Sequence, residues 1–263
     1  MPKKSKEQAV GSQNRTVTPN EAKSALTHCI KLQRPIMMWG APGIGKSDIV
    51  KQIADSEERD VIDIRLPLWE PTDIKGIPYY NSEENNMVWA SPAELPTDPK
   101  STAIVFLDEL NSAAPAVQAA AYQLILNRRV GQYHLPEGVS IVAAGNRDSD
   151  KGVTYRMPAP LANRFVHIEL RVDYDDWLQW ATDRHIHSDV VGYCTFAKQD
   201  LYDFDPKGSS RSFATPRSWS FVSQLLSDDL PESTLTDLVA GCVGEGLAVK
   251  FMNHRKVSGQ LPN

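Results

Sequence analysis

The apolar positions of this chain fall into two different patterns, one on each side of about residue 171. In the first part, short apolar runs are separated by stretches of helical periodicity, and three of the runs are nearly continuous. Continuous apolar runs are typical of parallel strands whose two faces are both covered by helices. We therefore expect an α/β fold in this part. The predicted strands are Pro35–Trp39, Val61–Leu66, Ala103–Leu107, Ser140–Ala144 and Phe165–Leu170.

The second part of the chain shows only helical periodicity after Arg171, which indicates a small helical domain. The first residues are polar and poor in apolar groups, as in a flexible arm, and a capped helix is expected from Thr18 or Asn20. The late helices are expected near 173–184, 190–202, 216–227 and 235–252. The predicted organisation is an arm over residues 1–16, a core over 17–171 and a helical lid over 172–263.

Composition narrows the class of protein. With 263 residues, 41% of them apolar, the chain can bury a sizeable core. Its net charge of −5 argues mildly against nucleic acid as the main ligand, because phosphate-backbone binding usually needs a basic surface. No apolar run approaches the roughly 18 residues of a membrane helix, and the start lacks the apolar segment of a signal peptide. We therefore expect a cytoplasmic protein, with its three cysteines as buried, reduced thiols.

A glycine-rich loop follows the first of these predicted strands and precedes a predicted helix. Its residues GAPGIGKS match the spacing G-x-x-x-x-G-K-[ST], in which glycines let backbone N–H groups converge on a phosphate. The positive end of the helix dipole adds to this attraction. Lys46 is expected to reach the outer phosphates, and the Ser47 hydroxyl to bind Mg²⁺. The residues predicted to bind the phosphates are Gly40, Ala41, Pro42, Gly43, Ile44, Gly45, Lys46 and Ser47.

Two acids, Asp108 and Glu109, stand at the carboxyl end of the third predicted strand. Open parallel sheets bind their ligands at this end of the strands. Because Mg²⁺ prefers carboxylate oxygen, Asp108 is predicted to be its second protein ligand, usually through a water. Glu109 suits the orientation and activation of the attacking water in phosphoryl transfer. A pair of merely solvated acids is the alternative, and the phosphate loop upstream disfavours it.

Three further polar residues follow predicted strands or open a predicted helix. Asn146 ends the fourth strand, where its amide can bind the γ-phosphate or the attacking water, although a simple turn residue is the alternative. Arg164 precedes the last strand and can stabilise charge on a transferred phosphate, with a surface salt bridge as the alternative. Arg217 follows Thr215 and Pro216, which suit a helix N-terminus. Since the helix dipole disfavours a cation there, Arg217 is expected to bind an anion.

Over roughly residues 18–226, the order of these motifs resembles that of the AAA+ ATPases, and within them the MoxR-like group. GAPGIGKS is similar to Walker A, and FLDELN to Walker B with Asn111 as its trailing asparagine. The resemblance implies that Asn146 is sensor 1, that Arg164 is the arginine finger and that Arg217 is sensor 2.

Two segments extend the resemblance and two features depart from it. EPTDIKG and RRVGQYHLPEG are similar to the loop after the second strand and the hairpin insert before sensor 1 in MoxR-like proteins. Asn163, however, stands where many relatives have aspartate, and the stretch GNRDSDKGVTYRMPAP is unusually long and basic. Because this stretch contains Arg147 and Arg156, either of them is a rival of Arg164 for the arginine finger, which acts on the nucleotide of a neighbouring subunit.

The resemblance implies a P-loop NTPase fold, with a three-layer αβα core around a five-stranded parallel sheet and a small all-helical lid. It also implies ATP and Mg²⁺ as cofactors, and a hexameric ring in which ATP lies between subunits. Family members often act as chaperone-like remodellers beside a protein with a von Willebrand factor A domain. The resemblance thus predicts an ATP-hydrolysing remodeller of a partner protein. Its predicted catalytic residues are Lys46, Glu109, Asn146, Arg164 and Arg217.

Other functions fit the sequence less well. An AAA+ ATPase acting on nucleic acid, such as a helicase loader or initiator, is the main alternative, but the acidity and the lack of a DNA-reading appendage argue against it. A nucleotide-gated scaffold without hydrolysis predicts that Glu109→Gln leaves function intact. A small-molecule kinase fits poorly, because the acid pair and the arginines suit attack by water. A GTPase would need an N-K-x-D motif for guanine, which the chain lacks.

Overall fold

The computed structural model describes residues 15–150, 154–228 and 230–258, so the predicted arm over residues 1–16 lies almost wholly outside the described residues. A parallel sheet of six strands forms the centre of the first part of the chain. In spatial order these strands are β1 (Thr16–Val17), β10 (Val166–Leu170), β2 (Ile36–Trp39), β9 (Ser140–Gly145), β6 (Ile104–Asp108) and β3 (Val61–Arg65).

The five predicted strands and their parallel arrangement are confirmed, but the sheet has one strand more than predicted. The extra strand β1 pairs at the edge, with Thr16 opposite Glu169 and Val17 opposite Leu170. Two residues are too few to carry a periodic signal, so this strand depends on a partner far along the chain. Thr16, which the sequence analysis places in the arm, therefore belongs to the sheet.

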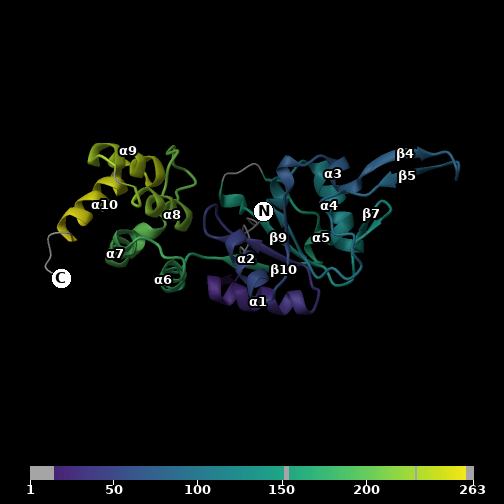
Figure 1. Ribbon diagram of the computed structural model, residues 1–263, viewed down its shortest axis with the longest axis horizontal. Helices are drawn as coiled ribbons and strands as arrows, with labels where there is room; N and C mark the ends of the chain where they lie inside the picture. Colours follow the sequence, from purple (N-terminus) through teal and green to yellow (C-terminus); the bar gives the residue numbers. More distant parts are fainter. Residues whose placement is uncertain (1–14, 151–153, 229, 259–263) are drawn as a thin grey trace, which may run out of the picture.

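Helices cover both faces of the sheet, as the sequence predicts (Figure 1). Along β6, Ile104 and Phe106 face one apolar cluster, while Val105 and Leu107 face the other, as the two-residue period of a strand requires. The first cluster contains α1 (Pro19–Lys31) and α2 (Lys46–Ser56). The second contains α3 (Pro71–Lys75), α4 (Pro115–Asn127) and α5 (Ala159–Ala162). Three short 3₁₀ helices occur in the connections of this part of the chain: η1 (Leu66–Leu68), η2 (Leu110–Ser112) and η3 (Asp148–Asp150).

Two β-hairpins leave the core on the side away from the late helices (Figure 1). The longer pairs β4 (Ile77–Asn81) with β5 (Asn86–Ala90), and the shorter pairs β7 (Arg129–Val130) with β8 (Tyr133–His134). They contact each other, because the Trp89 backbone N–H donates to Gln132 Oε1 at 3.0 Å. The base of the longer hairpin is tight at Gly76, where φ is 86° and a Cβ would lie 1.8 Å from the Ala90 carbonyl oxygen. The two inserts are therefore in contact with each other.

The late helices pack on an apolar cluster of their own, centred on Tyr193, Trp219 and Phe251. They are α6 (Tyr174–Asp183), α7 (Ser188–Phe196), η4 (Lys198–Leu201), α8 (Pro216–Leu225), α9 (Glu232–Val243) and α10 (Glu245–Ser258). The single helix predicted near 235–252 is wrong: α9 ends and α10 begins around Gly244, whose φ of 94° breaks the helix. The stretch predicted near 190–202 is likewise divided between α7 and η4.

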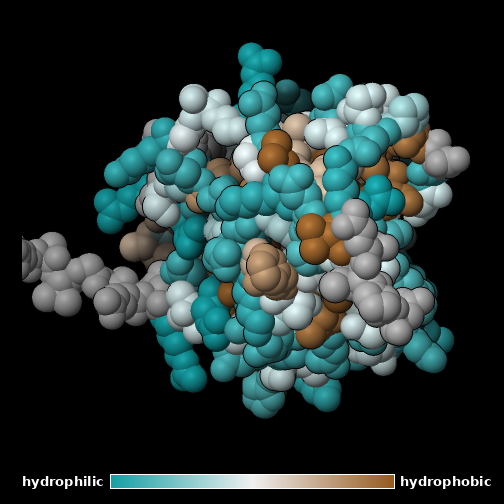
Figure 2. Space-filling model, turned by 90° about the vertical axis from the view of Figure 1, so that its left-hand side faces the viewer, coloured by the Kyte–Doolittle hydropathy of each residue, from teal (hydrophilic) through white to brown (hydrophobic). Residues whose placement is uncertain are grey.

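The surface of this helical end is largely hydrophilic, with separate hydrophobic side chains between the polar ones (Figure 2).

Helix α6 also contacts the core, because the Asp176 carboxylate accepts hydrogen bonds from the Asn20 backbone N–H at 2.7 Å and from Asn20 Nδ2 at 2.8 Å. Among the described residues, no helix combines the length and the apolar character needed to cross a membrane.

Candidate active site

The glycine-rich loop connects the end of β2 to the start of α2, and two of its glycines have left-handed φ values. At Gly43 φ is 77°, and a Cβ there would lie 2.7 Å from Thr215 Oγ1, so no side chain fits between the loop and α8. At Gly45 φ is 96°, and a Cβ would meet no heavy atom within 4 Å. Helix α2 begins without a side-chain cap, so its first N–H groups face the open space of the loop. This is the arrangement expected of an anion site.

Lys46, the first residue of α2, is buried beside this loop. Its Nζ donates to the carbonyl oxygens of Gly40 at 2.6 Å and Ala41 at 3.0 Å, and lies 3.4 Å from Asn146 Oδ1. Burial lowers the pKa of Lys46 to about 8, although the nearby Asp108 carboxylate acts in the opposite direction. A triphosphate beside this amine would raise its pKa and favour its charged form, so the surroundings of Lys46 favour binding of an anion.

The two acids occupy different positions at the end of β6. Asp108 is buried, and its Oδ2 lies 3.5 Å from Ser47 Oγ, while its Oδ1 accepts the Glu109 backbone N–H at 2.9 Å. Glu109 has a left-handed backbone, with φ of 55°, and its side chain is half-buried. Such a conformation is uncommon for a residue other than glycine and is often found at functional sites. A hydroxyl and a carboxylate at this spacing provide oxygen donors that suit Mg²⁺.

The predicted arginines have different surroundings. Arg164 is exposed, and within the described residues its side chain has no hydrogen bond or ion pair. Arg156 is also exposed, but Arg147 is held in its own chain by Asp150 at 2.9 Å and Glu169 at 3.3 Å. The ion pair between Arg147 and Glu169 cannot be predicted from the sequence, because Glu169 lies on β10, 22 residues further along the chain. Arg147 is therefore engaged within the subunit.

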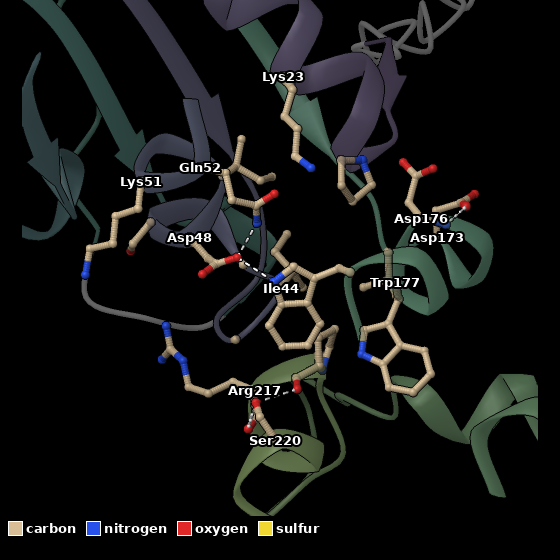
Figure 3. Close-up of a pocket in the computed structure, with 18 residues that line it drawn as sticks. Lys23, Ile44, Asp48, Lys51, Gln52, Asp173, Asp176, Trp177, Arg217 and Ser220 are labelled. Carbon is tan, nitrogen blue, oxygen red and sulfur yellow. Dashed lines mark hydrogen bonds between the residues drawn. The ribbon is translucent and has the colours of Figure 1, made fainter. Parts of the chain in front are cut away.

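A cavity of about 290 Å³ lies between the loop, α2, α6 and α8, as Figure 3 shows. Asp48 and Gln52 border it from α2, and Arg217 borders it from α8. The Trp180 indole N–H donates to Asp48 Oδ2 at 2.8 Å and so connects the late helices to the helix that follows the phosphate loop. No motif in the sequence indicates this pair.

Comparison with known proteins confirms the class of the site. The family model described as "ATPase family associated with various cellular activities (AAA)" matches residues 35–167. This chain belongs to the AAA family. The match includes the phosphate loop, both acids and the residues predicted as sensor 1 and arginine finger. As an AAA protein, the chain binds nucleotide and is an ATPase.

Proteins similar to this AAA protein range from one of about the same length to one that is many times longer. Midasin from Giardia intestinalis is 30% identical over 176 residues, which are 61% of this chain and 4% of midasin. A solved RuvB mutant from Thermotoga maritima has a TM-score of 0.50 and 16% identity, covering 89% of this chain and 68% of RuvB. A structure from Cytophaga hutchinsonii, described provisionally as an ATPase, has a TM-score of 0.49 and 15% identity, covering 91% and 90%. The RuvB match supports the P-loop fold and carries no argument about substrate.

The fold of this AAA ATPase brings most of the predicted site residues together. Lys46, Ser47, Asp108 and Asn146 are connected by the contacts described above, and Glu109 follows Asp108 directly. Of the predicted arginines, Arg217 reaches this site from α8. Arg164 does not join the contacts around the phosphate loop of its own subunit.

Proposed function

We propose that this AAA ATPase is a magnesium-dependent, MoxR-like motor that remodels a partner protein as a hexameric ring. AAA proteins generally assemble as rings, so the hexamer is the specific form proposed here. The proposed working parts are the core over residues 17–171 and the lid over 172–263. ATP is the substrate, and the relative motion of the two parts acts on the client.

The residues of the loop fit a magnesium–triphosphate complex. Ser47 and Asp108 offer a hydroxyl and a carboxylate 3.5 Å apart, and Gly45 faces space that no neighbouring atom fills. Mg²⁺ would be held by these two side chains, and when bound it neutralises charge on the phosphate oxygens. The apolar walls of the adjoining cavity, including Ile44 and Trp177, suit a purine base.

Each side chain then has one task in hydrolysis. Glu109 orients the attacking water and accepts its proton, and Asn146 binds the same water or the γ-phosphate. Lys46 stabilises charge that develops on the outer phosphates. Arg217 borders the cavity from α8. Its contact with the phosphates would therefore couple the position of the lid to the presence of nucleotide. No covalent intermediate is needed.

The exposure of Arg164 supports a site shared between subunits. A guanidinium with no partner among the described residues can act on a neighbouring subunit without first breaking an ion pair. Arg147 lacks this freedom because Asp150 and Glu169 hold it. Arg164 is therefore the proposed trans-acting residue, with Arg156 as its remaining rival.

The exposed side chains of the longer hairpin support the proposal that the client is a protein. Tyr80 and Met87 are 65% and 63% exposed, and Tyr79 and Ile77 are also exposed. The only charged residues between 77 and 90 are the acids Glu83–Glu84. Aromatic and apolar side chains of this kind suit contact with a polypeptide, whereas an acidic tip repels nucleic acid. A protein with a von Willebrand factor A domain is the proposed partner.

The test compares how ATP turnover responds to two kinds of macromolecule. We expect a purified protein with a von Willebrand factor A domain from the same organism to change turnover, and Tyr79→Ser with Tyr80→Ser to abolish the response. The matched control is Val257→Ser, which removes an equally exposed apolar side chain from the lid. Stimulation by duplex DNA with a salt-dependent affinity, and no response to protein, would replace the proposal by the nucleic-acid alternative.

A further inference from the structure

Asn111 makes an unusual pair of contacts with Asn146. Its Nδ2 donates to the Asn146 carbonyl oxygen at 2.8 Å, and its Oδ1 accepts the Asn146 backbone N–H at 3.1 Å. One side-chain amide thus satisfies both polar backbone groups of a single residue. Asn111 is only 2% exposed, so its amide side chain is shielded from water, while Asn146 is half-buried.

The surrounding chain is shaped to admit this amide. A Cβ on Gly145 would lie 2.6 Å from Asn111 Oδ1, a distance that real Cβ atoms essentially never show. Gly145 therefore leaves room for the amide to reach the backbone directly after β9. The carbonyl of Asn111 also accepts the Tyr155 backbone N–H at 2.7 Å, which fixes the position of Asn111 itself.

The amide connects the two halves of the hydrolytic site. Asn111 stands two residues after Glu109, and its partner Asn146 places Oδ1 at 3.4 Å from Lys46 Nζ. A shift of the Asn146 backbone would move its side chain relative to both Lys46 and the attacking water that the proposed function places beside Glu109. Misplacement by about 1 Å is enough to slow catalysis by about 100-fold.

We propose that Asn111 is a positioning residue for ATP hydrolysis: its side-chain amide clamps the Asn146 backbone and thereby aims the Asn146 side chain at the reacting phosphate. The clamp rests on the proposed sensor role of Asn146. Asn111 itself touches neither nucleotide nor water in this role. A group that only stabilised the fold would leave the chemistry of the intact protein unchanged.

The first test is Asn111→Asp, which keeps the shape and the acceptor of the amide but places an oxygen against the Asn146 carbonyl. We expect kcat to fall about tenfold or more, while the Kd of a fluorescent ATP analogue changes less than about threefold. Protonation of the introduced carboxyl restores a donor, so the kcat ratio of variant to wild type should rise as pH falls. A kcat equal to wild type, or a pH-independent ratio, overturns the clamp.

A double-mutant cycle with Asn146→Ala separates positioning from simple stability. If Asn111 acts through the Asn146 side chain, Asn111→Asp should change kcat less than about twofold once that side chain is absent. Additive losses in the cycle would mean that Asn111 acts independently, which overturns the clamp. If Asn146→Ala alone leaves kcat unchanged, the sensor assignment fails instead, and the two failures are distinguishable.

A second variant approaches the clamp from the other side and serves if Asn111→Asp does not fold. Gly145→Ala places a Cβ against Asn111 Oδ1, and the nearby Met37 methyl can move aside because it ends a flexible side chain. The matched control is Gly246→Ala, where a Cβ meets no atom within 4 Å. We expect Gly145→Ala to lower kcat about tenfold with little change in nucleotide affinity, and Gly246→Ala to leave both unchanged. Equal kcat in the two variants contradicts the proposal.

Discussion

Glu109 and Lys46 both occupy states that are unfavourable in the folded chain without nucleotide. Glu109 has a left-handed backbone, and Lys46 is buried with its pKa lowered to about 8. Each state is maintained because the surrounding loop and strand fix it, as is common at catalytic sites. In the proposed reaction, both residues are therefore in position before the substrate binds.

At this scale, Glu109→Gln should nearly stop turnover while ATP still binds. The amide keeps the size of the side chain but cannot accept a proton from water, so we expect kcat to fall by about 100-fold or more. Steady-state turnover and equilibrium binding of an ATP analogue measure the two effects. Unchanged turnover would remove the role proposed for Glu109 and favour the scaffold without hydrolysis.

The pKa of Lys46 predicts how the stability of the nucleotide-free protein depends on pH. The pKa is about 8 in the folded chain and 10.5 in the reference state, so between these values the unfolded chain binds more protons. The free energy of unfolding of wild type should therefore rise from pH 8 to 10.5 relative to Lys46→Met, by at most about 3 kcal/mol. Urea unfolding at both pH values tests this; parallel pH profiles would contradict it.

At the scale of elements, the break between α9 and α10 depends on one backbone conformation. Gly244 has φ of 94°, and a Cβ there would meet only the Ser212 carbonyl oxygen at the ordinary distance of 3.5 Å. Strain, rather than a collision, therefore excludes other residues. This explains why periodicity alone continues across the break and predicts a single helix.

Two alanine substitutions test this account of the break. Gly244→Ala should lower the free energy of unfolding by about 1–2 kcal/mol, because a left-handed conformation is unfavourable for an L side chain. Gly241→Ala lies inside α9 with open space around its Cβ, so it should raise the free energy of unfolding by up to about 1 kcal/mol. Chemical denaturation of both variants measures whether each substitution lowers or raises the free energy of unfolding. Equal effects would mean that the backbone of Gly244 is not strained.

The elements also show what the sequence can and cannot predict. The five longer strands and the phosphate loop are predictable because apolar runs and motif spacing are local signals. Strand β1, the Arg147–Glu169 ion pair and the Trp180–Asp48 hydrogen bond join residues far apart in the chain. Contacts of this kind depend on the packed structure, and the sequence offers no periodic pattern that indicates them.

At the scale of the whole molecule, the proposed function assigns the phosphate loop and the exposed Arg164 of one subunit to two different nucleotide sites. A subunit can give its loop to one nucleotide and its arginine to the next, as in a head-to-tail ring. The exposure of Arg164 and the lack of a partner within the described residues agree with this division. ATP turnover should then require the assembled ring and be absent from an isolated subunit.

Mixed subunits test whether the site is shared. Lys46→Ala and Arg164→Ala should each be inactive alone, and a random equal mixture should regain about a quarter of the sites, because intact loops then meet intact arginines. The control replaces Arg164→Ala by Arg147→Ala, whose ion pairs lie within the subunit, so mixing it with Lys46→Ala should give no more turnover than the two variants show separately. Specific ATPase activity should also rise with protein concentration. Recovery only in the control mixture would assign the trans role to Arg147.

The contact between Gly43 and Thr215 has a consequence for the assembled machine. Because no side chain fits between the loop and the start of α8, a tilt of that helix presses directly on the backbone around the phosphates. Mechanical load on the lid should therefore alter how tightly nucleotide is gripped. Under the proposed function, a client that resists being pulled would then slow the release of spent nucleotide, so the rate of hydrolysis would depend on the load.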